Sequence, residues 1–267
     1  MMVSIITINY NDSVGLKRTL DSVRFQTNHD YEHIIIDGAS TDGSIDVIRE
    51  YQDSEENVIA VIEPDSGPFF AMNKGIDLAN GDYCIFMNSG DSFYDEYVLE
   101  KFLSGSRTKD IYTGVACEHL GDTLYQWNPP YGIDINQKFF YGGGAISHQS
   151  SFIKTSLMKE MMYDTRYRIA ADWKFFLDAL VVRKVSYEHL PFFVSHYMDG
   201  GISRDAEKAY LERNLIFTEM FTKHQIADAQ RMIEWDELKK HIDPLSKVGS
   251  VIVGIAKYLL LLRKIKP

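Results

Sequence analysis

Short apolar runs alternate with stretches of helical periodicity through the first hundred residues of the chain. Four of these runs are typical of buried strands, at residues 3–9, 31–37, 58–62 and 82–87. Between them, helices are predicted to start at Asp12 or Ser13, to start at Thr41 or Asp42, and to span residues 71–79 before a stop at Gly81. Strands that alternate with helices form a mostly parallel sheet with helices on both faces. The pattern therefore predicts an α/β fold with a doubly wound sheet.

The pattern becomes irregular after residue 100. Short strands are expected near residues 111–117 and 145–153, a loop of three glycines at 142–144, and a helix over 171–182. From about residue 203 the periodicity is helical. A chain of 267 residues can form one large domain with an appendage. We therefore expect one domain made of a ligand-binding part (1–100) and a part that shapes a second substrate's site (101–204), followed by a helical C-terminal extension (205–267).

A polar loop follows each of the first four predicted strands. The loops are Asn9 to Asp12, Asp37 to Gly43, Glu63 to Gly67 and Asn88 to Asp91. In doubly wound sheets, ligands bind at the carboxyl ends of the strands. The four loops should therefore meet at one edge of the sheet and form a binding site there.

Composition narrows the choice of ligand and compartment. The formal net charge of −10 argues against nucleic acid as a partner, because phosphate backbones are bound by surfaces rich in Lys and Arg. The two cysteines, Cys84 and Cys117, lie in apolar runs without metal-ligand or redox spacing, so buried free thiols are expected. The N-terminus enters a strand pattern without a basic region, which indicates no signal peptide and predicts a cytoplasmic protein.

Two glycine signatures for phosphate binding are missing from this pattern. Gly38 and Gly43 have the spacing of a P-loop, but Ser44-Ile45 follows where Lys and Ser or Thr would be required. No GxGxxG follows the first strand either. A carboxylate-bound divalent cation at a strand end is the simplest remaining way to hold phosphates. Asp91 is placed to supply that carboxylate.

Four sequence blocks in this part of the chain resemble the N-terminal blocks of the family 2 glycosyltransferases. They are residues 4–11 (SIITINYN), 36–44 (IDGASTDGS), 72–75 (MNKG) with 79–81 (ANG), and 88–91 (NSGD), in the order and at the spacing of that family. The resemblance covers about residues 2–205. It implies a GT-A type fold, a nucleotide-sugar donor and an inverting, mostly metal-dependent transfer. His148-Gln149-Ser150 and Gly200 to Ser203 also look like blocks of a bacterial subgroup.

The resemblance also assigns residues to the donor. In the family, the loop after the first strand and the acid that ends the second strand bind the base and ribose, which maps to Thr7, Asn9 and Asp37. The plain alternative for Asp37 is a capping or turn residue. Further donor contacts fall on Asp65, Asn73, Lys74 and Ser89, although Pro64 to Gly67 is also simply a good turn.

Residues 88–91 look like a degenerate form of the family's Asp-x-Asp metal motif. Asn88 and Gly90 stand where acids are usual, which leaves Asp91 as the charged ligand for Mn²⁺ or Mg²⁺. Donor diphosphate oxygens and water would complete the shell. Asp91 could instead cap the next helix. His196 is a second metal-ligand candidate, with a structural strand histidine as its alternative.

An inverting transfer needs a general base for the acceptor hydroxyl. The family places an acid for this at the start of a helix, and Asp172 fits that position. The alternative is an acid that stabilises the helix dipole. His148 could contact the acceptor or satisfy a buried turn.

The C-terminal tail is apolar and basic. Residues 251–262 are apolar except for Lys257, which is too short to span a bilayer, where about 20 residues are needed. A helix over 248–264 would suit the surface of an anionic membrane, on its inner face. A helix packed on the body, or across a homo-oligomer interface, explains the pattern equally well.

These observations predict an enzyme that moves a sugar from a nucleotide sugar, expected to be a UDP-sugar, to a hydroxyl of a glycan. A membrane-bound tail would favour a lipid-linked acceptor in cell-envelope polysaccharide synthesis. Two alternatives stay open at this stage: a non-catalytic nucleotide-sugar-binding or scaffold subunit, and a nucleotidyltransferase of similar architecture. The loop after the first strand lacks the Gly, Arg and Lys that nucleotidyltransferases usually carry.

Overall fold

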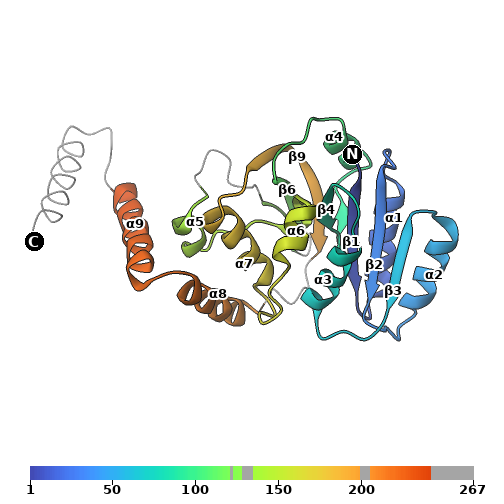
Figure 1. Cartoon of the computed structure of the whole chain (residues 1–267), viewed down its shortest axis with the longest axis horizontal. Helices are drawn as coiled ribbons and strands as arrows, with labels where there is room; N and C mark the ends of the chain where they lie inside the picture. The colour runs from blue at the N-terminus through green and yellow to red at the C-terminus, as the bar shows by residue number, and fades with distance from the viewer. Residues whose placement is uncertain (121–122, 128–134, 199–204, 242–267) are drawn as a thin grey trace, which may run out of the picture.

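One twisted sheet runs through the middle of the protein, with helices on both of its faces (Figure 1). The structure is a computed structural model and describes residues 1–120, 123–127, 135–198 and 205–241. Within these residues the strands follow the order β3-β2-β1-β4-β8-β6-β9-β5, and β7 pairs with β6. The strands are β1 (Val3–Asn9), β2 (Tyr31–Asp37), β3 (Val58–Ile62), β4 (Tyr83–Phe86), β5 (Ser92–Phe93), β6 (Ile111–Leu120), β7 (Thr123–Trp127), β8 (Ser151–Lys154) and β9 (Tyr187–Met198).

The first four strands are parallel neighbours, which confirms the doubly wound prediction. β1 pairs in parallel with β2 and β4, and β2 pairs in parallel with β3. Asn9 lies beside Asp37, and Asp37 beside Ile62, so the strands end at a common edge. The second half of the sheet is mixed, because β8 runs antiparallel to β4 and β6 whereas β9 runs parallel to β6.

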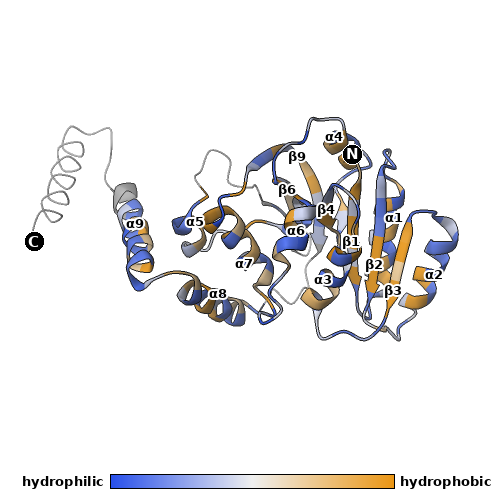
Figure 2. Ribbon diagram, viewed as in Figure 1, coloured by the Kyte–Doolittle hydropathy of each residue, from blue (hydrophilic) through white to orange (hydrophobic). Residues whose placement is uncertain are grey.

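Helices cover both faces of the sheet because alternate strand residues point to opposite sides. Ile6 and Ile34 pack with α3, α6 and α7, whereas Ile5 faces α4 and Ile35 faces α1 and α2. Figure 2 shows the apolar strands between helices whose outer faces are polar. These helices are α1 (Ser13–Arg24), α2 (Ser44–Ser54), α3 (Pro68–Leu78), α4 (Val98–Leu103), α5 (Gln137–Tyr141), α6 (Thr155–Met161), α7 (Ala171–Leu177), α8 (Ala206–Met220) and α9 (Lys223–His241).

Most predicted elements are confirmed, and the differences have local causes. Helix α3 begins earlier than predicted, at Pro68, since a proline fits the first helical turn. The predicted strand over 145–153 is wrong in its first half, where His148–Ser150 forms a 3₁₀ turn before β8. The helix predicted over 171–182 is α-helical to Leu177 and π-helical from Asp178 to Val182.

The C-terminal helices extend away from the sheet (Figure 1). Helix α8 packs on α7 through the buried Ile216 and Phe217, and α9 follows it and packs on α5. No helix in the described part of the chain is long and apolar enough to cross a membrane. The tail predicted to form a surface helix at 248–264 lies outside the described residues. The division of the chain at residues 100 and 204 stays a prediction.

Candidate functional site

A buried hydrogen-bond network joins the carboxyl ends of three strands. Asn9, at the end of β1, donates from Nδ2 to Asp37 Oδ2 at 2.6 Å, and its Oδ1 accepts from the Ser89 hydroxyl at 2.6 Å. Asp37 also accepts from the backbone and the hydroxyl of Ser40, at 2.7 and 2.8 Å. The predicted donor residues Asn9, Asp37 and Ser89 are therefore brought together at the expected edge. Asp37 is fully buried, so its carboxylate fixes the loops from below.

Thr7 lies deeper than its neighbours. Its side chain is fully buried, donates to the carbonyl of Met87 at 2.7 Å and contacts His33 Nε2 at 2.9 Å. His33 in turn contacts the Tyr51 hydroxyl at 3.1 Å. Burial lowers the pKa of His33 to about 3, which keeps this imidazole neutral. The structure places Thr7 under the strand ends, and a direct contact with a nucleotide stays a prediction.

Tyr10 is a site candidate that the sequence analysis missed. Its side chain is 69% exposed, although it follows a buried strand. A Cβ built on Gly38 would lie 2.9 Å from the Tyr10 ring and 3.1 Å from Asp65 Oδ2, so a larger residue at this position would force these side chains to shift. The exposed ring of Tyr10, the backbone of Gly38 and the carboxylate of Asp65 thus lie together at this end of the site. The signal was available, because Tyr10 lies within the first family-like block.

The loop between β4 and β5 is a tight turn held by α1. The Thr19 hydroxyl donates to the carbonyl of Asp91 at 2.7 Å and accepts from the Gly90 amide at 3.1 Å. Gly90 has a φ of 94°, a conformation that side-chain-bearing residues rarely adopt. The backbone conformation of the turn therefore explains why position 90 is glycine. The turn holds Asp91 in place with only 7% of its surface exposed.

The oxygen atoms of this turn fit a divalent cation that shares its shell with phosphates. Asn88 Oδ1 is buried and has no hydrogen-bond partner among the described residues, three positions before Asp91. A carboxylate, an amide oxygen and donor oxygens are the ligand types that Mg²⁺ takes in nucleotide sites. The described residues hold no cluster of three or more His, Cys, Asp or Glu that could bind a metal without such help. His196 lies opposite Ser92 in the β5–β9 pair and stacks on Tyr94, with ring centroids 4.8 Å apart.

Asp172 and Asn88 are joined through His148. His148 Nδ1 lies 3.0 Å from Asp172 Oδ2, and His148 Nε2 lies 3.3 Å from Asn88 Nδ2. A neutral imidazole with its proton on Nδ1 donates to the carboxylate and accepts from the amide. The amide nitrogen of Asn88 then donates to His148, and its side-chain oxygen remains available to another ligand. The structure brings the predicted base and the predicted metal loop into one connected site.

Two other predicted donor residues have partners elsewhere. The Asn73 side chain bonds both backbone groups of Tyr163, each at 2.9 Å, and so ties α3 to the segment after α6. Lys74 Nζ lies 2.7 Å from Glu63 Oε1 in a half-exposed ion pair. Their contacts with a donor stay predictions.

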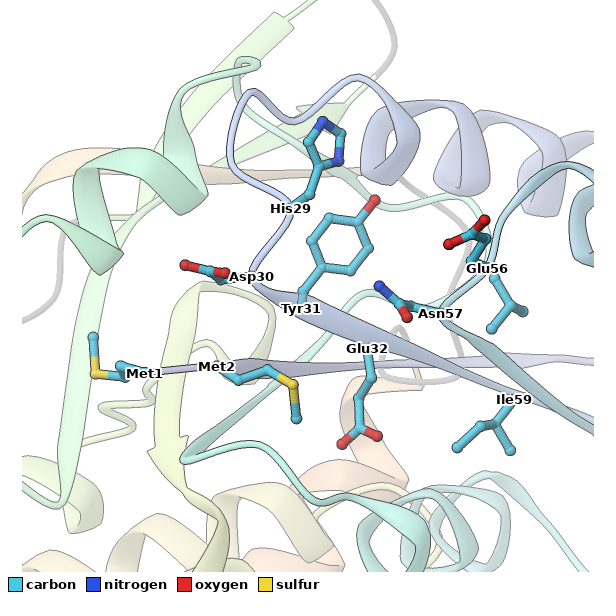
Figure 3. Close-up of a pocket in the computed structure, with 10 residues that line it drawn as sticks. Met1, Met2, His29, Asp30, Tyr31, Glu32, Glu56, Asn57 and Ile59 are labelled. Atoms are coloured by element: carbon cyan, nitrogen blue, oxygen red, sulfur yellow. The ribbon is translucent and has the colours of Figure 1, made fainter.

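An open pocket of about 550 Å³ lies at the opposite edge of the sheet, where the strands begin (Figure 3). Met2, Tyr31 and Glu32 line it. The Glu32 carboxylate accepts hydrogen bonds from the Ser4 hydroxyl at 2.6 Å and the Gly81 amide at 3.0 Å. Glu32 thus links the beginnings of neighbouring strands, and this role is structural. The candidate functional residues lie at the other edge of the sheet, where the strands end.

Curated relatives of this chain are bacterial glycosyltransferases. An uncharacterized glycosyltransferase of Mycobacterium tuberculosis is 37% identical over 187 residues, which are 67% of this chain and 69% of the relative. A PGL/p-HBAD biosynthesis glycosyltransferase of Mycobacterium bovis is 29% identical over 219 residues, 79% of this chain and 83% of the relative. The poly(ribitol-phosphate) beta-glucosyltransferase of Bacillus spizizenii is 29% identical over 198 residues, which are 70% of this chain and 31% of that longer protein.

Solved structures share the fold. S. aureus TarS 1–349 in complex with UDP-GlcNAc matches with a TM-score of 0.67 at 18% identity, over 86% of this chain and 70% of that chain. The mannosyltransferase PcManGT from Pyrobaculum calidifontis, in complex with GDP-Man and Mn²⁺, matches with a TM-score of 0.59 at 14% identity, over 97% and 80%. At these identities the similarity shows the architecture.

The family assignment follows from sequence. The profile described as glycosyl transferase family 2 matches residues 4–169, more than half of the chain and all of the strand-end loops described above. The resemblance found in the four sequence blocks is thereby confirmed. This chain belongs to glycosyl transferase family 2.

Proposed function

We propose that this glycosyltransferase moves a sugar from a uridine diphosphate sugar to a hydroxyl group of a glycan acceptor, with inversion at the anomeric carbon. The observation that carries the proposal is the series of hydrogen bonds from Asn88 through His148 to Asp172, with Asp91 in the same turn as Asn88. It links a loop suited to the diphosphate with a carboxylate suited to proton transfer. The complex of TarS, a protein of the same architecture, with UDP-GlcNAc supports the choice of donor.

In this proposal the nucleoside binds at the Tyr10 end of the site. The exposed Tyr10 ring offers a stacking surface for the base, and Asp65 offers a hydrogen-bond acceptor beside it. Asn9, Asp37 and Ser89 form the floor below, where their mutual hydrogen bonds hold the loops in register. Thr7 supports this floor through Met87.

Asp91 and Asn88 Oδ1 would hold a Mn²⁺ or Mg²⁺ ion together with the donor diphosphate, and His196 is the third proposed ligand. When bound, the cation would neutralise the charge that grows on the diphosphate as it leaves. The buried, unpartnered Asn88 Oδ1 supports this assignment. The complex of PcManGT with GDP-Man and Mn²⁺ provides an example of metal use in a protein of this architecture.

Asp172 would act as the general base. Its carboxylate takes the proton of the acceptor hydroxyl while that oxygen attacks the anomeric carbon from the side opposite the diphosphate, which inverts the configuration. His148 Nδ1–H donates to the carboxylate at 3.0 Å and fixes its direction. The other carboxylate oxygen accepts from the Trp173 amide at 2.7 Å. Both contacts orient Asp172 before the acceptor arrives.

For the acceptor we propose a lipid-linked glycan of the cell envelope, presented at the inner face of the membrane. The Bacillus spizizenii relative is named for poly(ribitol-phosphate), a polymer acceptor, and the apolar, basic tail of this chain suits an anionic surface. Truncation after Pro244 should abolish sedimentation with anionic vesicles and leave UDP binding intact. If the full-length protein ignores such vesicles, the proposed location is wrong.

The function is tested by screening nucleotide sugars for release of the nucleoside diphosphate, with Mn²⁺ and with chelator. We expect uridine diphosphate release from one or a few UDP-sugars, and its loss when metal is removed. Activity that chelator leaves unchanged would contradict the metal assignment. A folded protein that binds UDP but turns over no donor, with glycan fragments present, would favour the non-catalytic alternative.

A further inference from the structure

Helix α8 contacts the segment that leads to Asp172. The helix lies beyond the part of the chain that the family profile matches, which ends at residue 169. Glu212 accepts three backbone hydrogen bonds from consecutive residues just before α7. Its Oε1 accepts from the Arg168 amide at 3.0 Å, and its Oε2 accepts from the Ile169 and Ala170 amides at 2.8 Å each. One carboxylate thus fixes the backbone that leads into the helix of Asp172.

Helix α7 begins after a residue whose side chain cannot cap it. Its N-cap residue is Ala170, which has no side chain to accept from the amides of the first turn. Amides at a helix N-terminus carry partial positive charge, and hydrogen bonds to an ionised carboxylate are stronger than neutral ones. Glu212 therefore supplies from α8 a carboxylate for the amides that lead into α7, in addition to Asp172, the acid of the first turn.

Other side chains of α8 hold the two flanks of the same segment. Upstream, Glu219 Oε2 accepts from the Tyr167 hydroxyl at 2.7 Å. Downstream, the Phe217 ring packs against Trp173, the residue after Asp172, with ring centroids 5.5 Å apart. The Arg213 guanidinium lies over the Trp173 ring, 5.5 Å from its centroid. Residues 167–173 are therefore held along their length by one helix.

We propose that α8 is a positioning element of the active site and that Glu212 is the positioning residue for the base Asp172. This inference rests on the proposed function, since it takes Asp172 as the base. Proton transfer requires the carboxylate within hydrogen-bonding distance of the acceptor hydroxyl, and a displacement of about 1 Å can cost about 100-fold in rate. The donor loops lie on other elements, so donor binding does not depend on Glu212.

The experiment compares Glu212→Gln with Glu207→Gln, a change of the same chemistry at an exposed position in the first turn of α8. Glutamine keeps one acceptor oxygen but turns an NH₂ group toward a backbone N–H. We expect kcat to fall about 10- to 100-fold in Glu212→Gln, with unchanged UDP affinity, and to stay unchanged in Glu207→Gln. Glu212→Asp keeps both oxygens and should recover part of the rate.

A double-mutant cycle separates positioning from general stability. In an Asp172→Asn background, Glu212→Gln should lower the residual rate no further, because the base that it positions is already gone. An equal further loss in that background, unchanged kcat in Glu212→Gln alone, or weaker UDP binding in step with kcat would each overturn the inference. Wild-type turnover in Asp172→Asn would instead overturn the proposed base, which keeps the two failures distinguishable.

Discussion

The two sides of the site are held together in different ways. On the donor side, Asn9, Asp37 and Ser89 follow neighbouring parallel strands and bond to one another. On the acceptor side, Asp172 is held by His148, which is 24 residues away in the chain, and its segment by Glu212 on a separate helix. The donor side is therefore fixed by the sheet itself, whereas the base depends on elements packed against it. Substitutions on the acceptor side should therefore lower turnover more than they lower donor affinity.

The largest expected effect separates the two sides through the base. Asp172→Asn should lower turnover by about two to four orders of magnitude, because the amide cannot accept the proton of the acceptor hydroxyl. UDP affinity should stay unchanged. Steady-state kinetics measures turnover and calorimetry measures UDP affinity. Asp178→Asn, six residues further along the same helical segment, is the control. Full turnover in Asp172→Asn would move the base to another residue.

A smaller effect is expected from the partner of the base. His148→Gln should lower turnover about 10- to 100-fold, since it removes the partner that holds the Asp172 carboxylate, and a misplacement of about 1 Å can cost about 100-fold in rate. It should also disturb the donor side slightly, because His148 contacts Asn88. Kinetics at saturating donor, together with the donor KM, would detect both effects. A change in donor KM without a change in kcat would place His148 on the donor side alone.

On the donor side, Tyr10→Ala should weaken UDP binding about tenfold and leave the rate at saturating donor nearly unchanged. Stacking of a base on an aromatic ring is worth about 1–3 kcal/mol by alanine substitution. Tyr10→Phe keeps the ring and should bind UDP like the wild type. Equal affinity of all three proteins would remove Tyr10 from the nucleoside site.

The smallest effect is on stability and concerns the core below the donor loops. The pKa of His33 is lowered to about 3 by burial, so the unfolded chain binds a proton below about pH 6.5 that the folded protein does not. Stability should therefore fall as the pH drops from 6.5 toward 3, by about 2 kcal/mol at pH 5 from this residue. Urea unfolding at pH 7 and pH 5 should show a smaller decrease in His33→Gln than in the wild type. An equal decrease would show that His33 does not contribute.

The sequence predicted the donor side better than the acceptor side for a physical reason. Strands β1 and β2 were predicted with their observed bounds, because buried parallel strands are continuous apolar runs. Loops that follow such strands must meet at one edge, so Asn9, Asp37 and Ser89 could be grouped in advance. The close approach of Tyr10 to Gly38 is a tertiary contact, which no periodicity in the sequence reports.

The contacts of Asp172 could not be predicted in the same way. Its start-of-helix position was recognised, but the partner of the helix terminus, Glu212, lies 42 residues from Ala170 in sequence. Helical periodicity indicates that α8 exists and does not indicate which segment it touches. The 3₁₀ turn that presents His148 was likewise predicted as part of a strand, since the apolar residues around it resemble one.

The most direct test of whether the donor side and the base are separable is calorimetric titration of UDP, with Mn²⁺, into the wild type, Asp172→Asn and Asp91→Ala. We expect wild-type affinity for Asp172→Asn and loss of measurable binding for Asp91→Ala, because Asp91 is the one charged residue among the proposed ligands of the cation that bridges the protein and the diphosphate. Chelator should reduce the wild type to the behaviour of Asp91→Ala. Normal UDP binding by Asp91→Ala, or lost binding by Asp172→Asn, would contradict the separation of the donor side from the base.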